Sequence, residues 1–201
     1  MPVSDYPLFE SIKINNNQIF NLEYHKVRIA DSSKKLFGKI AHIDFKSITD
    51  EIKLLPPILF KLRLVYNADF FKYAFIPYKL PTTKSLKLVR SDKVSYNLKL
   101  SDRENLTNLY KRRQHYDDII IVKNGFITDS YNCNIALMKS GIWHTPNTPL
   151  LAGTKRNALI EQNKLIENEI HSDSLREYDY LSVINAMIDL DVITLPVSSI
   201  Y

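Results

Sequence analysis

The stretch ITDSYNCNIA, residues 127–136, is the most informative part of this sequence for fold and function. An Asn-Gly pair at 124–125 stands just before it and predicts a tight hairpin turn. Asp129 and Asn134 then place a carboxylate and an amide between two apolar segments. An acid carried by such a hairpin is a candidate for binding a ligand or moving a proton, although aspartate is also a common turn residue.

A second polar stretch follows further along the chain. Thr145-Pro146 leads into PLLAGTKR, residues 149–156. Gly153 and Thr154 stand where a helix is predicted to start, and the free backbone N–H groups of a helix start can bind a phosphate. Taken alone, the pair is explained more simply as a helix cap.

Apolar periodicity predicts the elements on either side of these stretches. In the N-terminal part we expect strands at 8–14, 18–20, 59–66 and 70–78, a helix capped by Asn21 and ended by Gly38, and a helix at 44–55. In the C-terminal part we expect strands at 85–89, 94–98, 119–122, 134–138, 142–145, 180–184 and 192–197, helices at 102–113 and 154–168, and a helical turn at 185–189. The mixture predicts an α+β fold rich in antiparallel hairpins. Two prolines in the segment 77–83 mark a linker, so we predict domains at 1–79 and 80–201.

The composition excludes several classes of protein. The 201 residues are 45% hydrophobic and 24% charged, which is typical of a globular chain. The four scattered glycines cannot form a Gly-rich dinucleotide or Walker loop. Cys133 is the only cysteine, and no two of the five histidines are four residues apart, so we predict no metal site.

The net charge of +5 has three possible explanations: a solvated helix face, a nucleic-acid partner, or a small anionic ligand. The basic residues are spread along the chain, and the densest cluster is only 111–113. We therefore expect no nucleic-acid partner. The first residues lack the features of a signal peptide, and no apolar run is long enough to span a membrane, so we predict a cytoplasmic protein without membrane contact.

The two polar stretches together resemble the class IV aminotransferases, which are the fold-type IV pyridoxal 5′-phosphate (PLP) enzymes. Four further segments are similar to this family in the same order along the chain: LFESI at 8–12, LEYHKVRI at 22–29, LRL at 62–64, and Asn185-Ala186 followed by Pro196-Val197. The resemblance implies a D-amino acid aminotransferase-like fold of two small α/β domains with the cofactor in the cleft. It also implies a homodimer.

The family requires a lysine to which PLP is covalently attached, and two positions compete. Lys99 stands at the expected end of a strand, with Arg103 four residues later, which resembles the K-x-x-x-R pattern of the family's lyases. Lys111 stands inside a predicted helix beside two arginines, where a solvated face explains it better. We therefore choose Lys99. A lysine that carries PLP must be desolvated or lie near positive charge, so that its amine is available near neutral pH.

The other roles follow from the resemblance position by position. Asp129 matches the acid that pairs with the pyridine nitrogen of PLP, and Arg28 matches the arginine that binds the cofactor phosphate. The remaining cofactor-binding candidates are Gly153, Thr154 and Lys155 of the phosphate loop, Asn134 as scaffold or phosphate support, and the turn Asn185-Ala186. Arg63 and Tyr131 are candidates for contact with the substrate, while Arg103 and Arg156 are as readily explained by structural roles.

Two departures from the family pattern stand beside the acid. Ser130 replaces a glycine, and Tyr131 replaces a small serine or threonine. Both add bulk near the expected position of the ring. In the phosphate loop, Thr154 and Lys155 replace isoleucine and threonine.

The resemblance implies a small anionic substrate that carries an amino group. The first hypothesis is a 4-amino-4-deoxychorismate lyase, which releases pyruvate and 4-aminobenzoate, a folate precursor. The second is an aminotransferase acting on D- or branched-chain amino acids. The third is a non-catalytic protein of the PLP fold, or a nucleic-acid-binding protein that uses the net charge of +5.

Overall fold

The computed structural model describes residues 5–201, so the expectation about a signal peptide lies partly outside the described residues. The described chain divides into two compact units. The first ends at Leu80 and also includes Leu98–Asp102, and the second consists of Pro81–Asn97 and Arg103–Tyr201. Within the described residues, no helix is long and apolar enough to cross a membrane.

The first unit is built on an antiparallel sheet in the order β2-β1-β3-β4. Its strands are β1 (Leu8–Asn15), β2 (Gln18–Ile19), β3 (Phe60–Tyr66) and β4 (Phe71–Pro77). In β1 and β3 the register places Glu10 opposite Leu64 and Ser11 opposite Arg63. Since side chains alternate along a strand, Glu10 and Arg63 project from opposite faces of this sheet.

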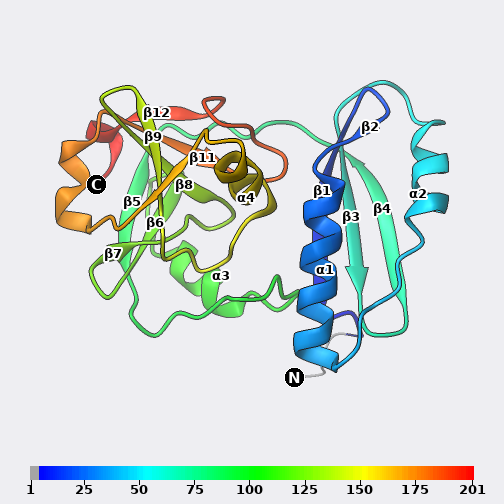
Figure 1. Cartoon of the computed structure of the whole chain (residues 1–201). Coiled ribbons are helices and arrows are strands. Elements are labelled where there is room, and N and C mark those ends of the chain that lie inside the picture. Colours follow the sequence, from blue (N-terminus) through cyan, green and yellow to red (C-terminus); the bar gives the residue numbers. More distant parts are fainter. Residues whose placement is uncertain (1–4) are drawn as a thin grey trace. The chain divides into compact units, whose positions relative to one another are not determined.

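Two helices, α1 (Leu22–Phe37) and α2 (Phe45–Ile52), cover one face of this sheet (Figure 1). Ile29 of α1 packs with Leu8 and Leu64, while Ile48 of α2 packs with Ile12. Gly38 ends α1 in the left-handed region, as predicted. Asn21 precedes the helix but makes no side-chain cap, because its own backbone is left-handed.

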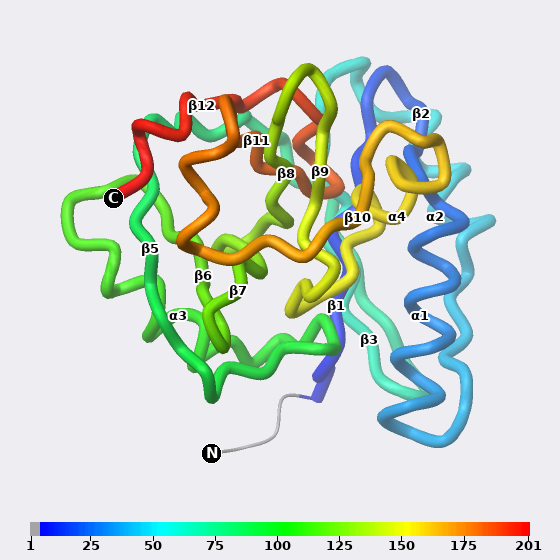
Figure 2. The backbone as a smooth tube through the Cα atoms, turned by 60° about the vertical axis from the view of Figure 1, so that its left-hand side comes forward, coloured from blue at the N-terminus to red at the C-terminus, as the bar shows by residue number. Residues whose placement is uncertain are grey.

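The second unit contains two sheets. The smaller has the order β5-β6-β7, from β5 (Leu86–Arg90), β6 (Asp118–Lys123) and β7 (Phe126–Ile127). The larger has the order β10-β9-β8-β11-β12, from β8 (Asn134–Lys139), β9 (Ile142–Pro146), β10 (Ile166–Asn168), β11 (Tyr180–Ile184) and β12 (Thr194–Pro196) (Figure 2). The helices are α3 (Glu104–Lys111) and α4 (Thr154–Glu161), with short 3₁₀ turns at Ser172–Glu177 and Val197–Ser199. The predicted buried strand is confirmed, since Ile119 to Val122 are all buried in β6.

Three predicted elements of the second unit are wrong. No strand forms at 94–98, where Val94 and Tyr96 are buried in an irregular segment. The predicted helix at 154–168 ends after Glu161, because Asn163 adopts a positive φ of 56° and the chain then forms β10. Residues 185–189 form a tight turn in place of a helical turn, because the Asn185 side chain accepts hydrogen bonds from the N–H groups of Met187 and Ile188.

The division into units differs from the predicted domains at Leu80 and at residues 98–102. Both belong to the first unit, whereas the predicted second domain is 80–201. The segment 98–102 runs beside the start of β1, where Leu100 bridges to Leu8 and the Phe9 N–H donates to the Lys99 carbonyl at 3.1 Å. Lys99 is therefore a residue of the first unit.

Candidate active site

A bulge in the β6–β7 hairpin presents Asp129. The turn that joins the strands is the predicted one, with positive φ angles at Asn124 and Gly125. Beyond β7, the Thr128 N–H donates to the Ile121 carbonyl and the Ile121 N–H donates to the Asp129 carbonyl. Thr128 and Asp129 therefore both oppose Ile121. This is the geometry of a β-bulge, which changes the direction of the side chains that follow.

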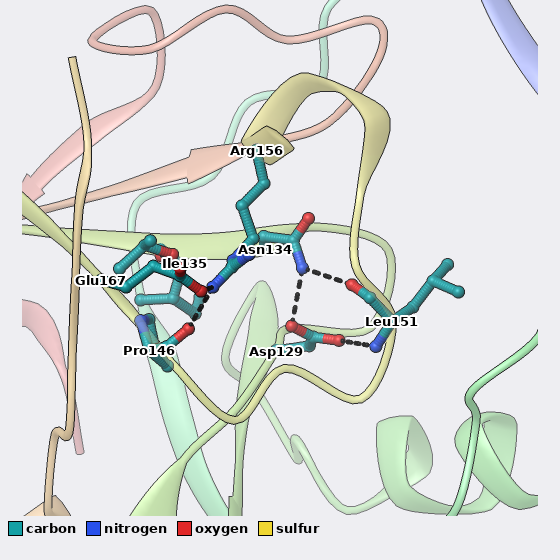
Figure 3. Close-up of polar contacts among 8 residues, drawn as sticks. Asp129, Asn134, Ile135, Pro146, Leu151, Arg156 and Glu167 are labelled. Carbon is teal, nitrogen blue, oxygen red and sulfur yellow. Dashed lines mark hydrogen bonds and ion pairs between the residues drawn. The ribbon is translucent and has the colours of Figure 1, made fainter. Parts of the chain in front are cut away.

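The Asp129 carboxylate is buried and held by two neutral donors (Figure 3). Its Oδ1 accepts from Asn134 Nδ2 at 2.8 Å, and its Oδ2 accepts from the Leu151 N–H at 3.0 Å. Among the described residues, no cation forms an ion pair with it. Burial therefore dominates and raises the pKa of Asp129 to about 7, although both hydrogen bonds act in the opposite direction.

The turn after Asp129 explains why serine can replace the expected glycine. The Ser130 N–H donates to the Cys133 carbonyl at 2.8 Å, and the Cys133 N–H donates to Ser130 Oγ at 3.1 Å. Ser130 is not among the residues with positive φ, so its backbone does not require a glycine. Its hydroxyl tightens the turn in a way that glycine could not.

Asn134 links the acid to the start of α4. Besides its bond to Asp129, its Nδ2 donates to the Leu151 carbonyl at 2.8 Å (Figure 3). A Cβ on Gly153 would lie 2.0 Å from Asn134 Oδ1, so only glycine fits beside this side chain. Of the two roles considered for Asn134, these contacts are those of a scaffold.

The start of α4 follows Gly153, as expected of a phosphate-binding loop, but its lysine is already paired. Gly153 is the N-cap residue, and Thr154 is buried in the first turn. The ammonium of Lys155 forms an ion pair with Asp189, at the far end of the Asn185 turn. Lys155 therefore links α4 to that turn.

Asn185 organises the turn through both ends of its amide. Its oxygen accepts the two N–H groups described above, and its Nδ2 donates to Cys133 Sγ at 3.1 Å. Ala186 lies inside the turn and is partly buried. The turn is thus tied to the same 130–133 segment that follows Asp129.

Arg156 has a structural environment. It is buried, and its Nη2 donates to the Pro146 carbonyl at 2.8 Å and to Glu167 at 2.5 Å (Figure 3). These bonds connect α4 to β9 and β10.

Tyr131 and Arg103 form a stack that joins the acid's turn to α3. The Tyr131 ring stacks on Tyr110 at 4.4 Å, and its hydroxyl lies 3.2 Å from Thr107 Oγ1. The Arg103 guanidinium lies 4.5 Å from the Tyr131 ring and also donates to the Tyr131 carbonyl and to the Asn132 side chain. The bulk added by Tyr131 is therefore packed against α3.

In the first unit, Lys99 and Arg63 share one aromatic ring. The Lys99 Nζ lies 4.6 Å from the centroid of Phe9, and the Arg63 Cζ lies 3.7 Å from it. By the alternation of β1 and β3, Phe9 and Arg63 project from the face opposite the helices, and the Lys99 ammonium lies beside the same ring. By contrast, Lys111 is exposed at the end of α3, where it donates to Asn108 of the same helix at 3.4 Å.

Arg28 projects from α1 toward a buried carboxylate. Its Nε donates to Glu10 Oε1 at 2.8 Å, and its Nη2 donates to Glu10 Oε2. His25 Nδ1 lies 2.7 Å from Glu10 Oε2, and the Glu10 and His25 side chains are fully buried. The side chain of Arg28 is 13% exposed.

The structure thus gathers the predicted residues into two groups. In the second unit, Asp129, Asn134, Gly153, Lys155 and Asn185 form one connected network, with Tyr131 beside it. In the first unit, Lys99 and Arg63 share Phe9, and Arg28 pairs with Glu10. The sequence did not predict the contacts made by Phe9, Glu10, His25, Leu151 and Asp189. Glu10 lies in the segment LFESI and His25 in LEYHKVRI, so the family motifs could have indicated them. Nothing in the sequence near Leu151 or Asp189 indicates their roles.

Comparison with known proteins shows the family of the chain. Residues 7–200 match the family described as amino-transferase class IV. The chain belongs to the class IV aminotransferase family. An uncharacterised protein from Haemophilus influenzae is 34% identical over 185 residues, covering 90% of this chain and 98% of that protein.

Solved structures of other proteins share the fold. The crystal structure of a proposed 4-amino-4-deoxychorismate lyase from Haemophilus somnus 129PT is 34% identical, has a TM-score of 0.88, and covers 92% of this chain and 98% of that chain. A hypothetical aminotransferase from Mycobacterium tuberculosis, in a PLP-bound form, is 14% identical with a TM-score of 0.76, covering 98% and 82% of the two chains. The fold is therefore the α+β fold of type IV PLP enzymes, and members of this class IV family bind PLP.

The residues present fit that cofactor. A buried carboxylate without an ionic partner suits a protonated pyridine nitrogen, which would supply the missing cation. Gly153 and the N–H groups at the start of α4 suit a phosphate. The chain therefore has complementary groups for the two ends of PLP.

Proposed function

We propose that this class IV protein is a PLP-dependent 4-amino-4-deoxychorismate lyase, which releases pyruvate and 4-aminobenzoate. The observation that carries PLP dependence is the buried Asp129 carboxylate with no cationic partner among the described residues. The choice of a lyase is supported by the 34% identity to the proposed lyase over 98% of that chain.

In this proposal, each group has a definite role. Asp129 would hold the ring nitrogen of PLP, and the start of α4 with Arg28 would hold its phosphate. Asn134 and Asn185 would keep these elements in place. When bound, the cofactor supplies an electron-withdrawing ring, which acidifies the carbon that carries the substrate amino group.

Lys99 would move the proton. Its amine would take the proton from that carbon and pass it to the departing enolpyruvyl group, which leaves as pyruvate. Loss of this group makes the six-membered ring aromatic, which drives the reaction forward without a keto-acid acceptor. Arg63, which lies beside the same Phe9 ring as Lys99, would bind a substrate carboxylate.

A class IV aminotransferase acting on D- or branched-chain amino acids is the second candidate. The observation that favours it is membership in a family described by transamination. The two candidates differ in one requirement: a transaminase consumes a keto acid, and the proposed lyase does not.

The deciding experiment incubates the PLP-loaded protein with 4-amino-4-deoxychorismate in the absence of any keto acid and measures pyruvate. The proposal expects pyruvate and 4-aminobenzoate in equal amounts. If no pyruvate forms from this substrate, while D- or branched-chain amino acids are converted once a keto acid is added, the second candidate is correct.

Lys99→Ala should lower the rate by about 10³-fold or more, because the proton transfer loses its base. Lys111→Ala is the matched control, since it removes an exposed lysine from α3. Borohydride reduction of the loaded protein, followed by peptide mapping, should mark Lys99. Marking of Lys111, or a fully active Lys99→Ala variant, would overturn the assignment.

A further inference from the structure

The feature that the proposed function leaves unexplained is the buried group Glu10, His25 and Arg28. Glu10 lies on β1, and the other two residues lie one turn apart on α1. The carboxylate accepts from Arg28 through both oxygens and also contacts His25 Nδ1 at 2.7 Å. An arginine held at two points by a buried carboxylate has a fixed plane and orientation.

The charges in this group follow from its surroundings. Arg28 and His25 lower the pKa of Glu10 to about 2, overcoming the opposing effect of burial. Burial lowers the pKa of His25, so the ring is neutral at pH 7. Because an ionised carboxylate can only accept hydrogen bonds, the His25 Nδ1 must carry a proton and donate it.

The pair with Glu10 uses two of the five N–H donors of the guanidinium. The Glu10 carboxylate also compensates the positive charge of Arg28. Arg28 would therefore contribute to the binding of an anion through directed hydrogen bonds more than through net charge. Directed hydrogen bonds depend on orientation. A free arginine side chain loses rotamer entropy when it binds, and the contact with Glu10 removes most of that freedom in advance.

We propose that Glu10, itself held by His25, is a positioning residue that fixes the Arg28 guanidinium for recognition of the PLP phosphate. This inference rests on the proposed PLP function. It distinguishes two explanations of the same ion pair. A purely structural pair would stabilise the first unit and affect every ligand alike, whereas a positioning pair affects only a ligand that carries the phosphate.

The test compares PLP with pyridoxal, which lacks the phosphate. Apo protein is titrated with each compound, and the dissociation constants are measured by absorbance for the wild type and for Glu10→Gln. The proposal expects PLP affinity to fall by about tenfold in Glu10→Gln, while pyridoxal affinity stays within about twofold of the wild type. Equal losses for both compounds, or no loss for PLP, would overturn the inference.

A double-mutant cycle identifies the route of the effect. If Glu10 acts through Arg28, Glu10→Gln should cause no further loss of PLP selectivity in an Arg28→Ala background. An additive loss would mean that Glu10 acts on the phosphate by another route, which contradicts the proposal.

Two further variants separate positioning from folding. Ser33→Ala removes a buried hydroxyl of α1 that donates to the Ile29 carbonyl, and it should leave the affinities for both compounds unchanged. Arg28→Lys keeps the charge but cannot bridge both Glu10 oxygens, so it should lose PLP selectivity even if Glu10→Gln fails to fold. Full PLP selectivity in Arg28→Lys would count against the proposal.

The failure of the proposed function would look different. If the wild-type protein binds neither PLP nor pyridoxal, the PLP assignment itself is wrong. If the wild type prefers PLP and every Glu10 and Arg28 variant keeps that preference, PLP binding stands, and the roles of Glu10 and Arg28 toward the phosphate are refuted.

Discussion

At the scale of single residues, the environment of Asp129 determines its chemistry. A carboxylate in a turn is normally solvated and ionised at neutral pH. Here the bulge after β7 and the Leu151 N–H place it in the interior, and its pKa is raised to about 7. A cationic ligand atom beside Asp129 would restore its ionised form. An ionised carboxylate is what an ion pair with a protonated pyridine nitrogen requires.

This environment predicts a pH dependence of stability for the apo protein. In the unfolded chain Asp129 ionises near pH 4, whereas in the folded chain it holds its proton until about pH 7. The folded state therefore binds more protons in that interval, and the contribution of Asp129 to the free energy of unfolding falls by about 1.4 kcal/mol per pH unit as pH rises. The contribution is fully present below pH 4 and is lost above pH 7.

Urea unfolding of the apo wild type and of Asp129→Asn, at pH 5 and pH 8, measures this contribution. Asp129→Asn cannot ionise, so its stability relative to the wild type should improve by about 2 to 3 kcal/mol between the two pH values. Bound PLP should reduce that difference, because it stabilises the ionised form. A constant difference between the variants at both pH values would contradict the buried, proton-binding state.

At the scale of elements, the start of α4 depends on a close contact with the Asp129 turn. Asn134 bonds to Asp129 and to the Leu151 carbonyl, and its Oδ1 occupies the space where a Cβ of residue 153 would lie. The backbone φ of Gly153 is −72°, a value open to any residue. The requirement for glycine therefore comes from this contact and not from backbone conformation.

Gly153→Ala should destabilise the protein by about 1 to 3 kcal/mol, because the new methyl group forces Asn134 or α4 to move. In an Asn134→Ala background the same substitution should cost much less, since the clashing oxygen is gone. Chemical denaturation of the four proteins gives this coupling energy. Equal costs in the two backgrounds would show that the contact is unimportant.

At the scale of the whole molecule, the residues with proposed roles come from both units of the chain. Lys99, Arg63 and Arg28 belong to the first unit, and Asp129 with the start of α4 belongs to the second. The chain passes between the units three times, after Leu80, Asn97 and Asp102. Lys99 and Arg103 are only four residues apart in sequence, yet each is held by contacts inside its own unit.

The prediction at this scale concerns assembly. We propose a homodimer on the basis of the family resemblance, so light scattering should give about twice the chain mass of 23.4 kDa. The thermal midpoint of a dimer that unfolds on dissociation also rises with protein concentration. A mass of one chain and a midpoint independent of concentration would refute the dimer.

The sequence alone determined the family, the mixed α+β class and most elements. These depend on local signals: alternating apolar residues for strands such as β6, Gly38 and the Asn-Gly turn for chain reversals, and motifs in a fixed order. Local signals also gave wrong predictions. The apolar alternation at 94–98 predicted a strand, but it reflects buried side chains in a segment without strand pairing. The helical periodicity predicted a helix to residue 168, but α4 ends before Asn163.

Only the tertiary structure decided what each functional residue contacts. The pairing of Arg28 with Glu10, of Lys155 with Asp189, and of Asp129 with Leu151 joins residues 18, 34 and 22 positions apart. Such pairs leave no periodic trace, because they arise where separate elements pack together. The sequence therefore indicates which residues are candidates, and the packing of distant elements determines the charge, burial and orientation that give each one its role.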